Sequence, residues 1–515
     1  MNTAVYRNQY LLVLTIIIIG IALRSVEYAS NRSFASDEAL TAQRIVSISL
    51  KESFFLEGKP HSRMQSYPVG FLLFIKMFIQ QYGASEPVLR LFPFLCGVMS
   101  VFVFLKLAAE VLRGSWLLLA LWLFAFSRDL VYYASELKPY ASDALITMGA
   151  SLLFFKMINQ SLSRLEVWVY VLLGALAVYI SFPVVFVLIS VGGTLMLYFF
   201  FKGEWEKTRQ LLIMGLIWGA SFCFYYWVSI RHITVDPILL KFWNVNFMPV
   251  NEGPVMVVQW FIVVLKRIFS KFLQLPTALA AVGFMLGVVS LFFQTKGKFI
   301  VLVVPILFTL FLSALKMYPF DGRTIIFLFP AVILIIVEGI RVLGQNKSKF
   351  FEKVVSGFLI VFLAFYPTIF GYRQFAEPFG AEEIKPVLQY IKENGKSDDL
   401  ILVYQGALSA YQYYAPRYQM NNQIQVMDRK KALDFANHIR EGKISRVAKR
   451  FWVIFTHVGF DARANARLVI LGRLDSVAKR LDGVMVEVTP HSQIQTIENN
   501  ISASAYLFSL GRNSP

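Results

Sequence analysis

Two adjacent acids, Asp37 and Glu38, follow the first long apolar run of this 515-residue chain. A carboxylate beside a low-dielectric membrane surface is partly desolvated, so it can act as a general base towards a hydroxyl group. The alternative is structural, with Ser36 as the N-cap of a helix whose positive end faces both acids. The spacing by itself favours this second interpretation.

A second candidate segment, Tyr132–Tyr140, places aromatic residues, an acid and a base between two apolar runs. Lys138 could hold a phosphate, while Glu136 orients either that phosphate or a hydroxyl group. The alternative is an aromatic belt with a lysine that snorkels to the membrane surface. The residue types fit both interpretations equally.

The turn 318–323 contains a third candidate, Arg323, whose guanidinium could bind two phosphate oxygens at once. The alternative is a simple ion pair with Asp321 in a Pro/Gly turn. Loop 231–255 adds His232, a weak signal by itself. The chain has only five His, too few to indicate a histidine-rich metal site. Neither a P-loop nor a Rossmann glycine pattern is present at a position where it could bind a phosphate.

The composition indicates which elements must position these residues. Hydrophobic residues make up 57% of the chain, charged residues make up 16%, and the mean hydropathy is +0.58. Soluble domains carry about 25% charged residues, so lipid must be the solvent here. The net charge of +18 fits the positive-inside bias and an attraction to anionic lipid headgroups. Since the Lys and Arg residues are scattered, we expect no nucleic-acid partner.

Apolar runs of about 20 residues, the length that crosses a bilayer, recur through residue 371. We predict eleven transmembrane helices, or thirteen if two doubtful runs also span. The doubtful runs, 68–82 and 256–273, carry Lys76 and the pair Lys266–Arg267 in their interior, so we interpret both as interfacial or re-entrant helices. The predicted spans are 10–29, 88–111, 115–134, 140–158, 166–182, 184–201, 209–230, 276–294, 299–316, 323–343 and 354–371.

The loops and the tail complete this organisation. With the N-terminus inside, the loops rich in Lys and Arg face the cytoplasm and the candidate residues collect on the other side. After residue 371, helical patterns alternate with short apolar runs, which is typical of a small soluble α/β domain. We therefore predict a polytopic α-helical membrane module at 1–371, with the first outer loop at 30–67, and a C-terminal α/β domain at 372–515.

Five motifs, taken in order, resemble those of the C-type (GT-C) membrane glycosyltransferase superfamily, in the bacterial branch related to protein O-mannosyltransferases and the lipid A aminoarabinose transferase. They all fall on the side of the membrane opposite the positive loops. A single proline at Pro68 replaces the double proline of the superfamily, and Asp321 replaces a second glycine. The motifs are Asp37-Glu38, Ser66–Phe71, Tyr82–Leu91, Tyr133–Tyr140 and Tyr318–Arg323.

This resemblance implies an inner-membrane enzyme that transfers a sugar from a polyisoprenyl-phosphate donor to an acceptor hydroxyl, with inversion. Its active site and C-terminal domain would be extracytoplasmic. Asp37 would deprotonate a glycolipid, glycan or protein acceptor, and Glu38 would assist. A divalent metal is possible, because some members of the superfamily use one. The implied donor-phosphate ligands are Lys138, Arg323, Arg63 and Arg90, and the implied substrate-binding residues are Glu136, Tyr133, Tyr140 and Tyr67.

Two other functions compete with this one. A transporter or flippase of lipid-linked sugars predicts charges deep in the spans and inverted repeats, and the sequence shows neither pattern clearly. An envelope polysaccharide polymerase or ligase would depend on Arg and His residues of the outer loops in place of Asp37. Dependence of the activity on Asp37 would therefore distinguish the glycosyltransferase from the polymerase or ligase.

Overall fold

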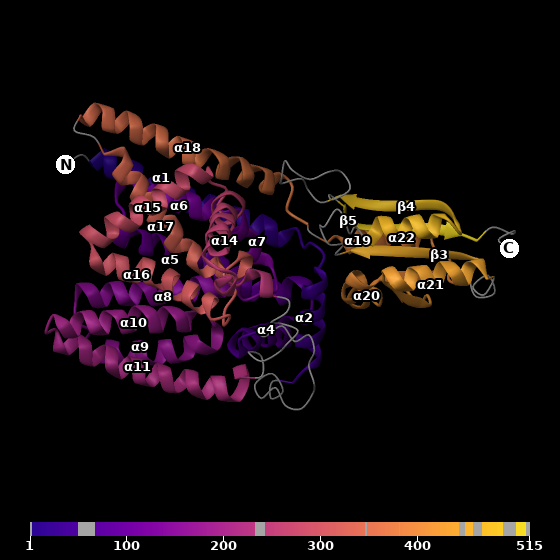
Figure 1. Cartoon of the computed structure of the whole chain (residues 1–515), viewed down its shortest axis with the longest axis horizontal. Coiled ribbons are helices and arrows are strands. Elements are labelled where there is room, and N and C mark those ends of the chain that lie inside the picture. Colours follow the sequence, from indigo (N-terminus) through magenta and orange to yellow (C-terminus); the bar gives the residue numbers. More distant parts are fainter. Residues whose placement is uncertain are drawn as a thin grey trace. The chain divides into compact units, whose positions relative to one another are not determined.

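The computed structural model forms two compact units (Figure 1). The first unit comprises Met1–Ala29 and Ile48–Ala376. The second comprises Ser30–Ser47 and Glu377–Pro515. The described residues are 3–49, 67–231, 243–345, 348–380, 382–441, 449–456, 466–487 and 501–510.

The first unit is a bundle of helices that lie side by side (Figure 1). Lipid offers no hydrogen bonds to the backbone, whereas a helix satisfies its N–H and C=O groups internally. Long apolar runs therefore fold as helices. The principal helices are α1 (Thr3–Ala29), α5 (Glu86–Val111), α6 (Gly114–Phe126), α8 (Tyr140–Asn159), α9 (Arg164–Ile180), α10 (Val184–Phe201), α11 (Trp205–Tyr225), α15 (Thr277–Gln294), α16 (Lys296–Ala314), α17 (Phe329–Gly344) and α18 (Lys349–Ala376).

Within the described residues, nine helices are long and apolar enough to cross a membrane, or ten if a bent pair counts as one span. The bent pair replaces the predicted span 115–134, because α6 and the short helix α7 (Arg128–Tyr132) meet at 54°. The predicted span 166–182 is α9, whose 17 residues leave it one residue short of the 18 that the nine counted helices have or exceed. The polytopic helical fold is confirmed, whereas the predicted eleven spans exceed this count.

The two doubtful runs form helices that are not among those nine. Residues 68–82 become α4 (Val69–Tyr82), a short apolar helix. Residues 256–273 become α14 (Pro254–Lys266), and the helix widens into a π-helical segment, η5 (Arg267–Phe272), where the charged residues begin. α4 has 14 residues, fewer than the about 20 that a bilayer requires. α14 and η5 together are longer, but they carry Lys266, Arg267 and Lys271, which are costly to bury in lipid.

Glycines allow two of the crossing helices to pack closely. A Cβ on Gly287 of α15 would lie 1.9 Å from the carbonyl oxygen of Ile335 on α17. A Cβ on Gly339 of α17 would likewise lie 1.8 Å from the carbonyl oxygen of Gly283. Small residues four positions apart, such as Gly283 and Gly287, are a common device for helix association in membranes, because they bring backbones into contact.

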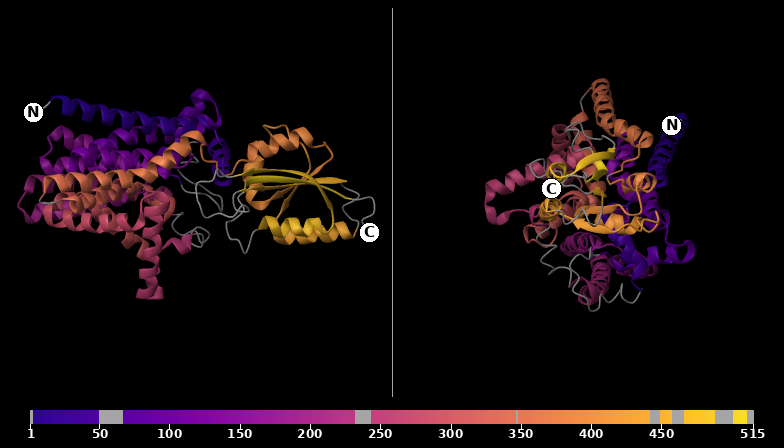
Figure 2. Two further views of the ribbon diagram at one scale, coloured as in Figure 1. Left: turned by 90° about the horizontal axis from the view of Figure 1, so that it is seen from above. Right: turned by 90° about the vertical axis from the view of Figure 1, so that its right-hand side faces the viewer.

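The second unit is an α/β domain whose five-stranded sheet has the order β2-β1-β3-β5-β4. β1, β2 and β3 are parallel, whereas β5 runs antiparallel to β3 and β4. Helices cover both faces of the sheet (Figure 2), as right-handed crossovers in opposite directions require. The elements are α2 (Ser36–Ser47), α19 (Ile384–Asn394), β1 (Leu400–Tyr404), α20 (Leu408–Tyr414), β2 (Ile424–Met427), α21 (Arg429–Arg440), β3 (Arg450–Thr456), α22 (Ala466–Asp475), β4 (Lys479–Glu487) and β5 (Ile501–Ser509).

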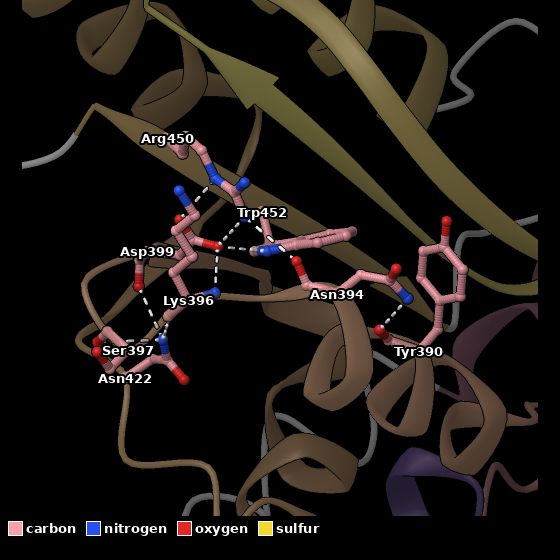
Figure 3. A network of polar contacts seen from close by, with 8 residues as sticks. All are labelled: Tyr390, Asn394, Lys396, Ser397, Asp399, Asn422, Arg450 and Trp452. Atoms are coloured by element: carbon pink, nitrogen blue, oxygen red, sulfur yellow. Dashed lines mark hydrogen bonds and ion pairs between the residues drawn. The ribbon is translucent and has the colours of Figure 1, made fainter.

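A polar network holds the beginnings of β1 and β3 together (Figure 3). The Asp399 carboxylate accepts two hydrogen bonds from Arg450, at 2.9 and 2.7 Å, and one from the Trp452 indole at 3.0 Å. It also accepts the backbone N–H of Lys396 at 2.9 Å. Burial opposes ionisation of Asp399, but these hydrogen bonds outweigh burial and lower the pKa of its carboxyl group. The network therefore stabilises the fold.

The segment predicted as the first outer loop does not belong wholly to the membrane unit. Residues 30–47, which include α2, belong to the compact C-terminal unit. We predicted all of 30–67 as part of the membrane module, with a domain boundary at 371. The compact units divide at Ala376 instead, and α2 joins the α/β domain through hydrogen bonds that no local pattern reveals.

Candidate active site

The largest group of predicted site residues lies at the turn before α8. After α7, a 3-10 turn at Tyr133–Ser135 leads to Pro139, which stands just before the first residue of α8. Proline is well tolerated at the start of a helix, because its missing N–H has no helical partner there. The Lys138 N–H donates to the Glu136 carbonyl oxygen at 2.7 Å. Both charged side chains are buried, with Glu136 3% and Lys138 2% exposed.

Lys138 does not snorkel to the surface. Its Nζ donates a hydrogen bond to the phenol oxygen of Tyr67 at 3.0 Å and lies 5.6 Å from the centre of that ring. Burying an ammonium group is costly unless polar or anionic groups surround it. This part of the structure therefore holds a fixed positive charge inside the protein.

Two further tyrosines lie beside this charge. Tyr133 and Tyr140 stand edge to face, with ring centroids 5.0 Å apart. Tyr140 is within electrostatic range of Arg323, Lys138 and Glu136, and Tyr133 is within range of Arg323 and Glu136. The structure thus brings together six predicted residues, which we name the Lys138 cluster: Tyr67, Tyr133, Glu136, Lys138, Tyr140 and Arg323.

Close packing positions the Lys138 cluster. A Cβ on Gly97 of α5 would lie 2.4 Å from the Cβ of Ala134, so only glycine allows the 3-10 turn to approach this helix. The backbone N–H of Val69, at the start of α4, donates to the phenol oxygen of Tyr225 at 2.9 Å. This bond ties the segment that follows Tyr67 to the end of α11.

The turn 318–323 is held by a different pair from the one considered in the sequence. The Asp321 carboxylate forms an ion pair with Arg267 and accepts a hydrogen bond from the Asn246 amide at 2.8 Å. The interpretation of an Asp321–Arg323 pair is therefore wrong. The Arg323 guanidinium lies over the ring of Trp243, 5.9 Å from its centre.

Burial alters the ionisation of two groups near the cluster. Tyr318 donates its hydroxyl proton to the Thr324 carbonyl oxygen at 2.8 Å, and burial raises the pKa of this phenol well above its ordinary value. Burial also lowers the pKa of Lys271, while the nearby charge of Asp129 acts in the opposite direction. Tyr318 therefore remains a neutral hydrogen-bond donor at physiological pH.

The other two predicted cations are Arg90 and Arg63. Arg90 is 2% exposed in the first turns of α5, so it does not snorkel, and it acts electrostatically on the phenol of Tyr28 in α1. Arg63 lies outside the described residues, as does His232. Donor-phosphate binding by Arg90 and Arg63 stays a prediction.

The acid pair belongs to the second unit, in the first turn of α2. Glu38 is buried, and its carboxylate accepts the backbone N–H of Ala35 at 3.3 Å, as the acid of a capping box does. Ala35, and not Ser36, stands before the helix. The neighbouring Asp37 is only partly buried. The structural interpretation thus describes Glu38, and the catalytic roles of both acids stay predictions.

The structure identifies no set of metal ligands among the described residues. Among the described residues, no group of three or more His, Cys, Asp or Glu side chains is placed to hold a metal ion. Asp37 and Glu38 are carboxylates, which hard divalent cations prefer. However, one carboxylate oxygen of Glu38 already accepts a backbone hydrogen bond.

Three residues that shape the site were missed in the sequence, namely Asn246, Arg267 and Tyr225. Arg267 was noticed only as a charge that argues against a span. A cation inside an apolar run and an acid in a nearby turn, such as Asp321, are a usable signal, since charges near lipid tend to be paired. Nothing in the sequence around Tyr225 indicates its bond to Val69, because this bond joins helices 156 residues apart.

The fold has counterparts among solved structures, although no protein-family model and no curated protein matches the sequence. The crystal structure of the Archaeoglobus fulgidus oligosaccharyltransferase in complex with Zn and sulfate is similar over 91% of this chain and 71% of its own, with a TM-score of 0.55 and 13% identity. ArnT from Cupriavidus metallidurans in the apo state is similar over 98% of both chains, with a TM-score of 0.50 and 9% identity.

Both of these proteins have the C-type glycosyltransferase fold. The chain therefore has the fold of the C-type membrane glycosyltransferases, as the order of its motifs predicts. At 9% to 13% identity the similarity defines the architecture. The side chains of this protein must carry the argument for its chemistry.

Proposed function

We propose that this protein is an inverting glycosyltransferase that moves a sugar from a polyisoprenyl-phosphate donor to an acceptor hydroxyl. The Lys138 cluster is the observation that carries the proposal. Lys138 and Arg323 stand where crossing helices begin, at Tyr140 and Gly322. A lipid-linked phosphate needs apolar surroundings for its tail and fixed cations for its headgroup, and this arrangement supplies both. The fold shared with two glycosyltransferases supports the same class of reaction.

The proposed reaction forms one glycosidic bond and breaks one sugar–phosphate bond. The carboxylate of Asp37 takes the proton of the acceptor hydroxyl, whose oxygen attacks the anomeric carbon on the face opposite the phosphate. The bond from that carbon to the phosphate oxygen breaks, and its electron pair leaves with the polyisoprenyl phosphate. Attack opposite the leaving group inverts the configuration. Glu38 assists by fixing the turn that carries Asp37.

The cations offset the negative charge of the departing phosphate. Such a leaving group is stabilised by fixed positive charges and does not need a proton from an acid. Lys138 provides a compact charge, and Arg323 can donate two parallel hydrogen bonds to phosphate oxygens. Glu136 and the tyrosines of the Lys138 cluster orient the donor through its hydroxyl groups. Arg90 and Arg63 are further candidates for phosphate binding.

We assign the reaction to the extracytoplasmic side of the inner membrane. This assignment rests on the positive-inside pattern, since the loops at the opposite ends of the spans carry residues such as Arg113, Lys156 and Lys202. The C-terminal unit then also lies outside the cytoplasm. The transferred sugar is a hexose or a pentose, and the acceptor is a hydroxyl of a glycolipid, a glycan or a protein.

A buried charge in the first span does not favour the transporter hypothesis. The Arg24 guanidinium, which is fully buried, donates to the carbonyl oxygens of Gly20 at 2.9 Å and Ala125 at 3.2 Å. It also lies 5.6 Å from the centre of the Phe124 ring. These contacts of Nη1 tie α1 to α6 and give the side chain a packing role, while Nε and Nη2 have no hydrogen-bond partner among the described residues.

The decisive experiment is the substitution Asp37→Asn. The amide keeps the shape of the side chain but cannot accept a proton, so we expect a folded, inserted protein without sugar transfer. Transfer is measured by mass spectrometry of lipids and envelope glycans from cells that carry either form. Asp434→Asn is the matched control, because this acid is exposed on α21 of the same unit. Transfer by D37N at the wild-type rate would remove Asp37 from the mechanism.

A further inference from the structure

The segment that carries Asp37 is held by two acids of the C-terminal chain. The Glu383 carboxylate accepts the backbone N–H of Ser33, at 3.2 and 3.1 Å to its two oxygens, and the Ser33 hydroxyl at 2.9 Å. The neighbouring Glu382 accepts the backbone N–H of Ser36 at 2.8 Å. Ser33 and Glu383 are 350 positions apart in sequence. The residue next to Asp37 is thus anchored to a distant part of the chain.

The segment before α2 also forms hydrogen bonds with Lys385, in the first turn of α19. The Ser33 hydroxyl oxygen accepts the backbone N–H of Lys385 at 3.2 Å, and the Lys385 ammonium donates to the Asn31 carbonyl oxygen at 2.7 Å. The first N–H groups of a helix have no partner within that helix, and they attract negative charge. At the start of α2, the Glu382 carboxylate therefore satisfies the free N–H of Ser36 and places a negative charge at the positive end of that helix.

Aromatic packing and a contact farther along α2 complete the attachment. The Tyr414 hydroxyl accepts the backbone N–H of Phe34 at 2.8 Å, and the Phe34 ring stands edge-on to Tyr413, with centroids 5.1 Å apart. The Gln43 amide donates to the Ser409 carbonyl oxygen at 3.2 Å. The helix is therefore held at its start and again two turns later, which restricts its rotation as well as its position.

We propose that Glu382 and Glu383 are positioning residues for Asp37, and that the C-terminal unit thereby forms part of the catalytic apparatus. This inference rests on the proposed function. Glu382 binds the N–H of Ser36, which is directly before Asp37, so loss of this acceptor frees the backbone that bears the base. A catalytic group displaced by about 1 Å can cost about 10²-fold in rate.

The test uses the full-length protein and the double substitution Glu382→Ala/Glu383→Ala. Release of polyisoprenyl phosphate from a membrane lipid extract gives kcat and the extract concentration at half-maximal rate. Hydrogen exchange of amides 33–39 reports on attachment of the segment. We expect kcat to fall roughly 10- to 100-fold, with the half-maximal concentration unchanged and faster exchange at 33–39.

Two matched variants separate positioning from a general loss of structure. Glu393→Ala removes an exposed acid of α19 that bonds only locally to Gln389, and it should change neither kcat nor exchange. Glu383→Gln keeps an acceptor oxygen, so in the single variant most of the rate and the slow exchange should be retained. Glu383→Ala should lose more of both.

Several outcomes overturn the proposal. It falls if exchange at 33–39 accelerates without a change in kcat, if kcat falls while exchange stays slow, or if the double variant behaves as Glu393→Ala does. Asp37→Asn distinguishes this failure from failure of the proposed function. An inactive D37N beside a fully active double variant removes only the positioning role, whereas an active D37N removes the glycosyltransfer mechanism itself.

Discussion

The Lys138 cluster and the first turn of α2 both present a charged group, but different forces hold them. The cluster lies where membrane-crossing helices begin, and the close approach of Gly97 and Ala134 helps to fix it. The first turn of α2 and the segment before it are fixed by hydrogen bonds from Ser36 to the Glu382 carboxylate and from Ser33 to the Glu383 carboxylate. One region depends on the volume of its side chains, and the other depends on polar groups.

Because of this difference, Lys138, the proposed cation, and Asp37, the proposed base, should be sensitive to different kinds of substitution. Close-packed helices resist changes of even one methylene group, because the surrounding atoms relax only partly. A hydrogen-bonded attachment is sensitive to the loss of an acceptor, which leaves a donor unsatisfied. Substitutions in the α/β unit should therefore reach Asp37 and leave donor binding at Lys138 unchanged.

After the complete loss of transfer expected for Asp37→Asn, the largest effect is expected for Lys138→Ala. Loss of one group that stabilises developing charge typically lowers kcat by about 10²- to 10³-fold, or about 3–4 kcal/mol. We also expect the affinity for polyisoprenyl phosphate to fall more than the affinity for the acceptor. Lys349→Ala is the control, since this lysine is exposed at the start of α18. Equal losses of donor and acceptor affinity would show that Lys138 is structural.

An intermediate effect is expected for Asp399→Asn, which breaks a charge network in the other unit. An amide cannot accept hydrogen bonds on both sides, so donors of Arg450 and Trp452 lose a partner and the unit should be destabilised by about 1–3 kcal/mol. Hydrogen exchange of β1 and β3 in the full-length protein measures this. Asp398→Asn is the control, because Asp398 is exposed. Weaker binding of polyisoprenyl phosphate by D399N would contradict the separation of the two regions.

The pH dependence of this stability has a definite sign. The folded-state pKa of Asp399 lies below its unfolded value of about 3.9, so its contribution is complete above that pH. The contribution is lost as the pH falls through the folded-state pKa. The protection factors of the β1 and β3 amides, that is, exchange corrected for its intrinsic pH dependence, should fall more steeply below about pH 4 in the wild type than in D399N. Parallel acid profiles of the two proteins would contradict this assignment.

The smallest effect is expected for Tyr67→Phe, which removes the hydroxyl that accepts from Lys138 and keeps the ring. A single hydrogen bond contributes about 0.5–1.5 kcal/mol, so binding of polyisoprenyl phosphate should change by roughly 2- to 10-fold. Tyr82→Phe is the control, because Tyr82 is 65% exposed at the end of α4. An effect as large as that of Lys138→Ala would mean that Tyr67 does more than orient the ammonium group.

Much of the membrane unit could be predicted from the sequence. Long apolar runs fold as helices wherever lipid replaces water, so nine predicted spans are confirmed. The bend between α6 and α7 was missed because the run 115–134 is apolar almost throughout and carries Arg128 and Asp129 only near its end. Six of the predicted site residues gather in the Lys138 cluster, since their turns lie at neighbouring helix ends.

The order of spans, the α/β character of the tail and the chemical types of the candidate residues were determined by the sequence itself, because hydropathy and turn preference act over a few residues. Only the tertiary structure decided that Asp321 pairs with Arg267 and that α2 joins the C-terminal unit. The hydrogen bonds responsible connect residues 54 and 346 positions apart, as between Arg267 and Asp321 or Ser36 and Glu382. Such pairings depend on which surfaces meet after folding, and no local pattern encodes that.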